Sequence, residues 1–156
     1  MASVRSKPPV VVPAWLPIVS LALAVAGLLV AGYLTVEHFT ASTTLACPET
    51  GVVNCTKVTT SEQSKVFGIP VALLGLVFFV PMVVACLPQL WRDERPLVRY
   101  GRLGLATVGV IFVAYLVYAE LFVIDAICLW CTAVHVLTVA LFAVVAFGSA
   151  LVSPAR

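Results

Sequence analysis

Residues 127–151 read ICLWCTAVHVLTVALFAVVAFGSAL, and this stretch decides the fold. It contains no Asp, Glu, Lys or Arg, and it is long enough to cross a bilayer, which takes about 20 apolar residues in a helix. Two cysteines near its start, Cys128 and Cys131, are spaced i, i+3 and therefore lie one turn apart on one helix face. His135 follows on the same face, about 6 Å further along the axis.

The position of these cysteines at a helix start suits redox chemistry. The N-terminus of a helix is electropositive, so it favours a thiolate, which is the reactive form in thiol–disulfide exchange. In a spanning helix Cys128 would lie near the surface, Cys131 one turn deeper and His135 deeper still, which is the order that a redox relay into the bilayer needs. A CxxC motif also occurs in zinc sites and by chance. Other features of the sequence are therefore needed to distinguish a redox site from a zinc site.

The composition indicates an integral membrane protein. The chain has 156 residues, of which 62% are hydrophobic and only 10% are charged, whereas a soluble domain carries about 25% charged residues. We therefore predict an all-α membrane protein, a four-transmembrane-helix bundle. The predicted spans cover residues 16–36, 66–87, 103–124 and 127–151, inside a membrane domain of residues 15–152 with short tails at 1–14 and 153–156. The sequence contains no phosphate-binding loop and no long basic run, so it gives no indication of a nucleic-acid partner.

The first apolar run is predicted to be a span and not a cleaved signal peptide. It is too long for a usual signal h-region, and no convincing small-residue cleavage site follows it.

Lysine and arginine placement predicts the orientation. With four spans, the N-terminal tail, the loop of residues 88–102 and the C-terminus share one side, and that side carries seven of the nine basic residues. Both termini are therefore expected in the cytoplasm. The long loop of residues 37–65 and the start of the last span then lie outside, which brings Cys47, Cys55, Cys128 and Cys131 to the oxidising face.

Several other polar residues and the fifth cysteine have predicted structural roles. Thr59-Thr60-Ser61-Glu62 fits a capping box, so a short helix is expected to begin near Thr60. Glu120 is expected to reach the membrane interface, with proton transfer as the alternative. Asp125 is interpreted as a helix cap, and Cys86, far from the other cysteines, as a small buried apolar residue.

The cysteines allow three readings. Two pairs on one face permit a chain of disulfide exchanges, but a Cys47–Cys55 disulfide could equally staple the loop, and four cysteines could bind zinc or copper. If thiols are oxidised outside, the electrons need an acceptor, and the chain has no haem or flavin motif. A lipid-soluble quinone fits, because it can reach Cys131 from the bilayer. His135 would donate a hydrogen bond to it, and Phe67 and Trp130 would line the pocket.

Taken together, these features resemble the vitamin K epoxide reductase family in its short bacterial form. The likeness covers roughly residues 15–150. It rests on the pair Cys47 and Cys55, the segment Ser64-Lys65-Val66-Phe67-Gly68-Ile69-Pro70 with Gly75, and the CxxC motif with His135.

The resemblance implies four helices around a quinone, ubiquinone or menaquinone. It implies that Cys131 faces the quinone, that Cys128 exchanges with Cys55, and that Cys47 exchanges with a thioredoxin-like (DsbA-like) partner. The residues expected at the quinone are Cys131, His135, Ser64 and Phe67, and no metal site is expected.

The implied function is oxidation of that partner, which would support disulfide formation in exported proteins at the bacterial cytoplasmic membrane. The chain lacks the fused thioredoxin-like domain of some members, so the partner is expected to be a separate protein. Animal members reduce vitamin K epoxide, which is the alternative activity. They have an asparagine near the position of Ser64 and a tyrosine near that of His135, so this sequence favours thiol oxidation. Another membrane disulfide oxidase architecture places its quinone-side CxxC in the first outer loop, the reverse of the order here.

Overall fold

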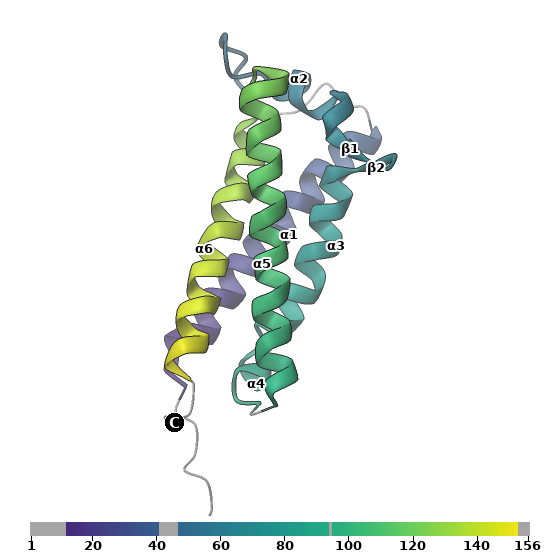
Figure 1. The fold of residues 1–156 in the computed structure, drawn as a ribbon. Helices are drawn as coiled ribbons and strands as arrows, with labels where there is room; N and C mark the ends of the chain where they lie inside the picture. Colours follow the sequence, from purple (N-terminus) through teal and green to yellow (C-terminus); the bar gives the residue numbers. More distant parts are fainter. Residues whose placement is uncertain (1–11, 41–46, 94, 153–156) are drawn as a thin grey trace, which may run out of the picture.

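The computed structural model describes residues 12–40, 47–93 and 95–152 (Figure 1). It is mostly helical. The long helices are α1 (Trp15–Thr40), α3 (Val71–Ala85), α5 (Pro96–Ala119) and α6 (Leu129–Leu151). The short elements are α2 (Cys55–Thr59), a 3-10 turn η1 (Glu62–Ser64), the strands β1 (Lys65–Val66) and β2 (Ile69–Pro70), α4 (Pro88–Trp91) and a π-helical turn η2 (Glu120–Ile124).

Three helices are long and apolar enough to cross a membrane, and they indicate a membrane protein. They cover Trp15–Thr40, Pro96–Ile124 and Leu129–Leu151, in agreement with three of the four predicted spans. The helix α3 is also apolar, but it has only 15 residues. The predicted second span, 66–87, is wrong at its start, because the chain up to Pro70 forms the antiparallel β1–β2 hairpin before the helix begins.

Two other boundaries differ from the prediction. The short helix expected to begin near Thr60 is the 3-10 turn η1, which begins at Glu62 with Ser61 at its N-cap and without a side-chain cap. Thr60 itself is the C-cap residue of α2, which begins at Cys55, where the Asn54 side chain accepts a hydrogen bond of 2.7 Å from the Lys57 amide. The predicted loop of residues 88–102 contains α4 and the first turns of α5, because Pro88 and Pro96 both suit a first helical turn. Most of the predicted tails, residues 1–11 and 153–156, lies outside the described residues.

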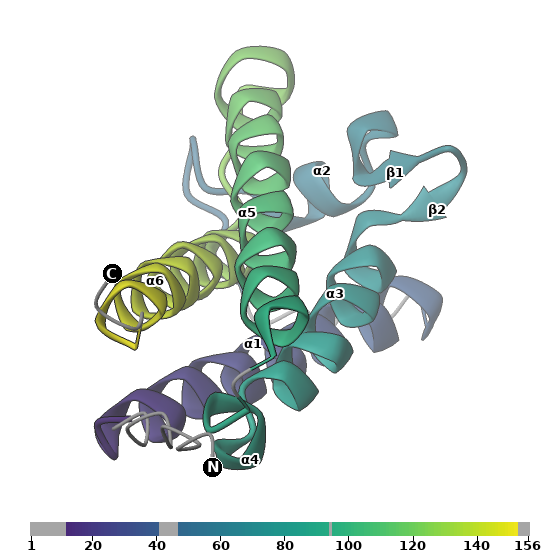
Figure 2. The ribbon, with the colours of Figure 1, turned by 60° about the horizontal axis from the view of Figure 1, so that its bottom comes forward.

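The helix α1 packs against both α3 and α6, and α5 packs against α6. The contact between α3 and α5 is smaller. Figure 2 shows the four long helices from below, with α1 crossing beneath the others and α5 standing apart from α3. The main core lies where α1, α3 and α6 meet, and it includes Leu16, Ala24, Phe79, Met82 and Leu141.

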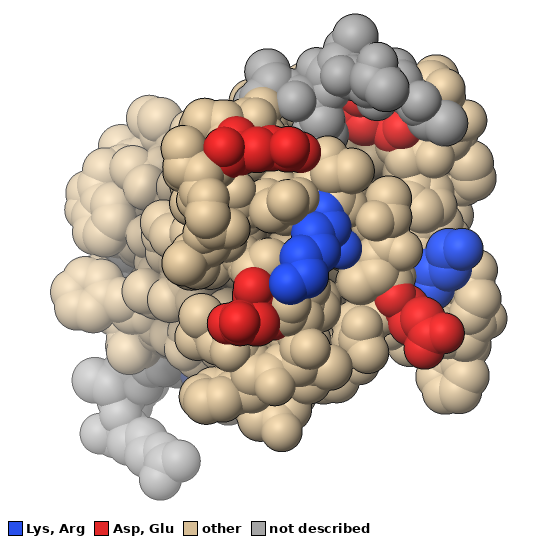
Figure 3. All heavy atoms as spheres, turned by 90° about the horizontal axis from the view of Figure 1, so that it is seen from above, with Lys and Arg blue, Asp and Glu red and all other residues tan. Residues whose placement is uncertain are grey.

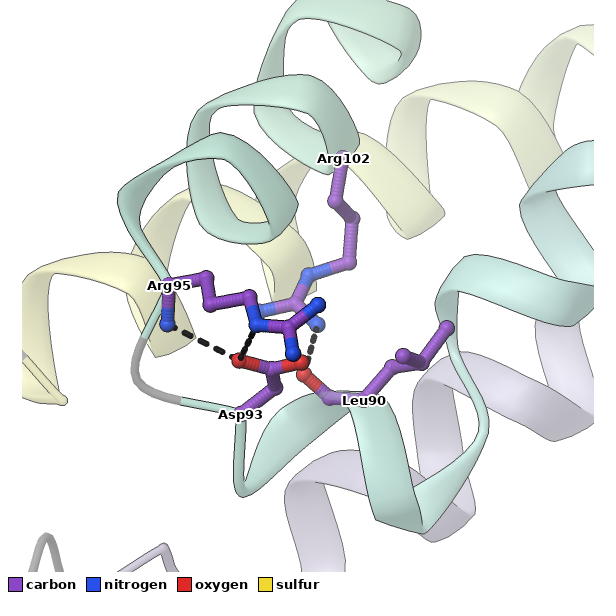
Figure 4. A network of polar contacts seen from close by, with 4 residues as sticks. All are labelled: Leu90, Asp93, Arg95 and Arg102. Atoms are coloured by element: carbon purple, nitrogen blue, oxygen red, sulfur yellow. Dashed lines mark hydrogen bonds and ion pairs between the residues drawn. The ribbon is translucent and has the colours of Figure 1, made fainter.

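The end of the molecule that carries α4 is held by a buried arginine. The Arg102 guanidinium stacks on the Trp91 ring at 3.5 Å, and its Nη1 donates hydrogen bonds to the carbonyl oxygens of Ala85 and Leu90. Nearby, Arg95 pairs with Asp93 (Figure 4). Trp91 Nε1 in turn donates to Ser20 Oγ at 3.0 Å, which ties α4 to α1. These contacts fix the end of α3 against its neighbours.

A small residue in α1 allows close packing of α3. A Cβ atom at Gly27 would clash with the ring of Phe79, which is fully buried. We predict that Gly27→Ala destabilises the protein by about 1–3 kcal/mol, because the core must shift to make room. Thermal unfolding in detergent measures this change. The matched control is Gly104→Ala, where no atom lies within 4 Å of the new Cβ. Its Tm should stay the same or rise slightly. An equal loss in both variants would contradict the packing argument.

Candidate functional site

The loop cysteines form a disulfide. Cys47 and Cys55 are bonded, with their Cα atoms 6.2 Å apart. Cys55 is the first residue of α2 and is fully buried, whereas Cys47 is half-buried. The Asn54 cap fixes the start of α2 and therefore the position of Cys55. The outer cysteine of the pair is thus the accessible one, and the inner one faces the protein.

Backbone pairing attaches this loop to the start of α6. The Asn54 amide donates to the Ile127 carbonyl at 3.1 Å, and the Ile127 amide donates to the Val52 carbonyl at 2.9 Å. This makes a parallel bridge between Val53 and Ile127. The Lys57 ammonium adds a hydrogen bond to the Asp125 carbonyl at 3.3 Å.

The backbone bridge between Val53 and Ile127 places the two cysteine pairs side by side. Cys55 follows Asn54 directly and Cys128 follows Ile127 directly, so the register of the bridge brings them to the same place. Both are fully buried, and they share one apolar cluster with Val58, Ile124 and Ala126. Cys47, Trp130 and Cys131 pack against that cluster. The structure therefore brings all four predicted catalytic cysteines together.

The CxxC motif begins α6. Cys128 is the N-cap residue, and its Sγ accepts a hydrogen bond of 3.3 Å from the Cys131 amide. A backbone donor at a helix N-terminus stabilises a thiolate on Cys128. Cys131, one turn further, is less buried and lines a cavity inside the helix bundle. Cys128 thus contacts the loop pair while Cys131 contacts the cavity.

The cavity has a volume of about 1000 Å³ and is bounded by all four long helices. Its lining includes Cys131 and the polar residues Ser64, Glu120, His135 and Thr138. It also includes the aromatic residues Phe78, Phe79 and Phe112. A concave, mostly apolar space with a few polar groups is typical of a site for a small ligand.

Two of the residues predicted at the pocket lie elsewhere. Phe67 is completely exposed at the turn of the β1–β2 hairpin, where its φ of 52° and the φ of 80° at Gly68 turn it away from the cavity. Trp130 packs against Tyr33, with ring centroids 4.9 Å apart. Ser64, Cys131 and His135 do line the cavity. Asp125, interpreted as a cap, adopts the left-handed conformation at the end of η2.

Several cavity residues carried no signal of their own in the sequence. Glu37 and His38 lie near the end of α1. Phe78, Phe112 and Thr138 lie within apolar runs where any helix face could be the buried one. Glu120 is buried, with 6% of its surface exposed, and does not extend to the interface as expected. Glu120 lies two helical turns after the buried Val113, on the face of α5 that also carries the buried Ala106 and Gly109.

A metal site has no support in the described residues. No group of three or more His, Cys, Asp or Glu side chains in that part of the chain could hold a metal ion. The disulfide also occupies two of the four cysteines that a zinc site would use.

The shared cluster predicts which cysteines can cross-link. In the variant Cys47→Ser/Cys131→Ser, Cys55 and Cys128 should form a disulfide under mild oxidation, because both sulfurs lie in one buried cluster. Peptide mapping by mass spectrometry detects the bond. The matched control, Cys47→Ser/Cys128→Ser, leaves Cys55 with Cys131 and should cross-link more slowly. Equal rates in the two variants would contradict the proposed order of the pairs.

Most of the chain matches the model of a known protein family. The model described as the Vitamin K epoxide reductase family matches residues 18–146, which is most of the chain. The matched region contains both cysteine pairs, the hairpin segment and the cavity-lining helices described above. The chain therefore belongs to the vitamin K epoxide reductase family, a family of oxidoreductases.

Proposed function

We propose that this protein is a membrane thiol oxidoreductase that passes electrons from an extracytoplasmic, thioredoxin-like (DsbA-like) partner to a quinone. The observation that carries the proposal is the bridge between Val53 and Ile127. It buries Cys55 beside Cys128 in one cluster, and Cys47 and Cys131 pack against that cluster. Cys47 is half-buried, and both Cys47 and Cys131 line the cavity. The two cysteine pairs are therefore close enough to pass electrons from a partner at the loop to a ligand in the cavity.

The proposed topology has four spans, with α3 as the second. Its 15 residues extend about 22 Å, less than the hydrocarbon core of about 30 Å. The support is that α3 lies beside α1 along the bundle, with the hairpin at one end and α4 at the other (Figure 1). A short span can be accommodated by local thinning of the bilayer.

The charge distribution supports the orientation. The end that carries α4 has the basic residues Arg92, Arg95, Arg99 and Arg102, which favours the cytoplasmic side. The opposite end, seen from above in Figure 3, shows basic side chains scattered among acidic ones. Both termini are then cytoplasmic, and the cysteines face the outside.

The proposed reaction begins at the loop. A thiolate of the reduced partner attacks the Cys47–Cys55 disulfide, and the partner's second thiol releases the partner as a disulfide. Cys55, now reduced, attacks Cys128 in the Cys128–Cys131 disulfide, which frees Cys131. Cys47 then attacks Cys55, restores the loop disulfide and releases Cys128. The loop disulfide with free Cys128 and Cys131 in the structure corresponds to the product of this step.

The hydrogen bonding at Cys128 supports this direction. Cys128 is the sulfur that must leave when the loop disulfide forms again, and thiols that ionise more readily leave faster. The Cys131 amide and the N-terminus of α6 stabilise that leaving thiolate. Each exchange moves two electrons inward without a metal or flavin.

The cavity fits a quinone as the final acceptor. A bound quinone would take two electrons and two protons from the Cys128–Cys131 dithiol and leave as a quinol. The aromatic walls suit a ring and an apolar tail, and Ser64 and His135 would hold its polar oxygens. His135 is 7% exposed and lies on the same helix face as Cys131, so it is placed to donate a hydrogen bond at the reacting end.

This function predicts different losses at the two ends of the route. Cys131→Ala should abolish quinone reduction with every electron donor. Cys47→Ala should block the thioredoxin-like partner but keep activity with a small dithiol, which can reach the inner pair directly. The change in quinone absorbance measures the rate of quinone reduction by each purified variant. Cys86→Ala is the control, because Cys86 lies by α4 at the far end of the bundle. Identical behaviour of the Cys47 and Cys131 variants would contradict the ordered relay, and preferred reduction of vitamin K epoxide would favour the alternative activity.

A further inference from the structure

Glu120 occupies an unusual place in the fold. The helix α5 changes there to a π-helical turn, which ends at the left-handed residue Asp125 and is closed by a hydrogen bond of 3.1 Å from the Ala126 amide to the Glu120 carbonyl. The next residues of the turn, such as Phe122, are exposed, while Glu120 itself is buried. Single π-helical turns within α-helices occur frequently at functional sites.

The Glu120 carboxyl group touches both halves of the inner site. It accepts a hydrogen bond from the backbone amide of Cys128, and its charge acts on the thiols of both Cys128 and Cys131. It also lines the cavity together with Cys131 and His135. In the described part of the chain, Glu120 forms no ion pair. No fixed counter-charge therefore holds it in the ionised form, and it can take up and release a proton.

The proposed reaction needs such a group. When the Cys128–Cys131 dithiol becomes a disulfide, it loses two electrons and two protons, and the quinone gains the same numbers. Each thiol must lose its proton before its sulfur can react. Cys128 is fully buried and Cys131 lines the cavity, so a proton acceptor beside the cavity can serve both thiols. Glu120 is the one described carboxyl group whose charge acts on both thiols.

We propose that Glu120 is the proton-transfer residue between the CxxC pair and the cavity. Its carboxylate accepts a proton from the dithiol as the Cys128–Cys131 bond forms, and the resulting carboxylic acid donates that proton to a quinone oxygen, directly or through His135. Glu120 carries the two thiol protons one after the other, so it returns to its starting form in each turnover and both protons end on the quinol oxygens. This inference rests on the function proposed above.

Glu120→Gln is the decisive variant, because the amide oxygen can still accept the Cys128 hydrogen bond but the side chain cannot carry the proton. Single-turnover reoxidation of the reduced protein by a water-soluble quinone should slow about 100-fold, within the range for general acid–base catalysis. Glu120→Asp should recover part of the rate. Exchange of the Cys47–Cys55 disulfide with a dithiol should be unchanged in both, which checks the fold. Glu62→Gln, an exposed carboxyl group outside the cavity, is the control.

The pH profile separates proton transfer from a structural role. The wild-type rate should follow an ionisation that Glu120→Gln lacks and Glu120→Asp retains at a shifted pH. The other titratable groups that line the cavity are Glu37, His38, Glu49, Lys65, Cys131 and His135, and their contributions stay in all variants.

The outcomes are distinct. A normal rate in Glu120→Gln overturns the role of Glu120 while leaving the proposed function intact. A wild-type protein that transfers no electrons to quinone overturns both. If Glu120→Gln fails to fold, an unshifted pH profile in Glu120→Asp also overturns the role of Glu120.

Discussion

The site depends on a short stretch of backbone pairing between the loop and the connection that leads into α6. Two hydrogen bonds between residues 52–54 and Ile127 position a polar loop against the start of an apolar helix. The hydrogen bond from Lys57 to the Asp125 carbonyl and the packing of Cys55 and Val58 against Ile124 and Ala126 reinforce this attachment. With them, Cys55 and Cys128 share one dry cluster, and exchange between the pairs needs little movement.

The membrane setting explains why the remaining parts are built as they are. Backbone groups inside a bilayer must be satisfied within the protein, so helices make up the spanning part. The irregular elements α2, η1, β1 and β2 are gathered at one end of the bundle (Figure 1). The two cysteine pairs lie where the helical and irregular parts meet, and one cysteine of each pair, Cys47 and Cys131, lines the cavity.

Much of this could be predicted from the sequence, because apolar length and cysteine spacing are local properties. The long helices, the inner position of Cys131 and the pairing of Cys47 with Cys55 follow from such patterns or from the family resemblance. The start of α3 and the turn at Phe67 could not be predicted, since they depend on a two-residue hairpin too short to show a period. Glu120 lies near the end of its predicted span, which favours a position at the interface, but it shares a helix face with the buried Val113. Which face of an apolar helix is buried depends on packing, which the sequence does not specify.

The looser contact between α3 and α5 has a consequence for how the cavity exchanges its contents. Residues of both helices line the cavity, so the cavity lies beside this weakly packed interface. In a bilayer this side faces hydrocarbon and not water. An apolar molecule would then arrive by lateral diffusion in the plane of the membrane, and its supply would depend on its concentration in lipid and on the fluidity of the acyl chains. The protein would then bind apolar molecules from the membrane through the side between α3 and α5, and it would react with soluble thiols at its outer end.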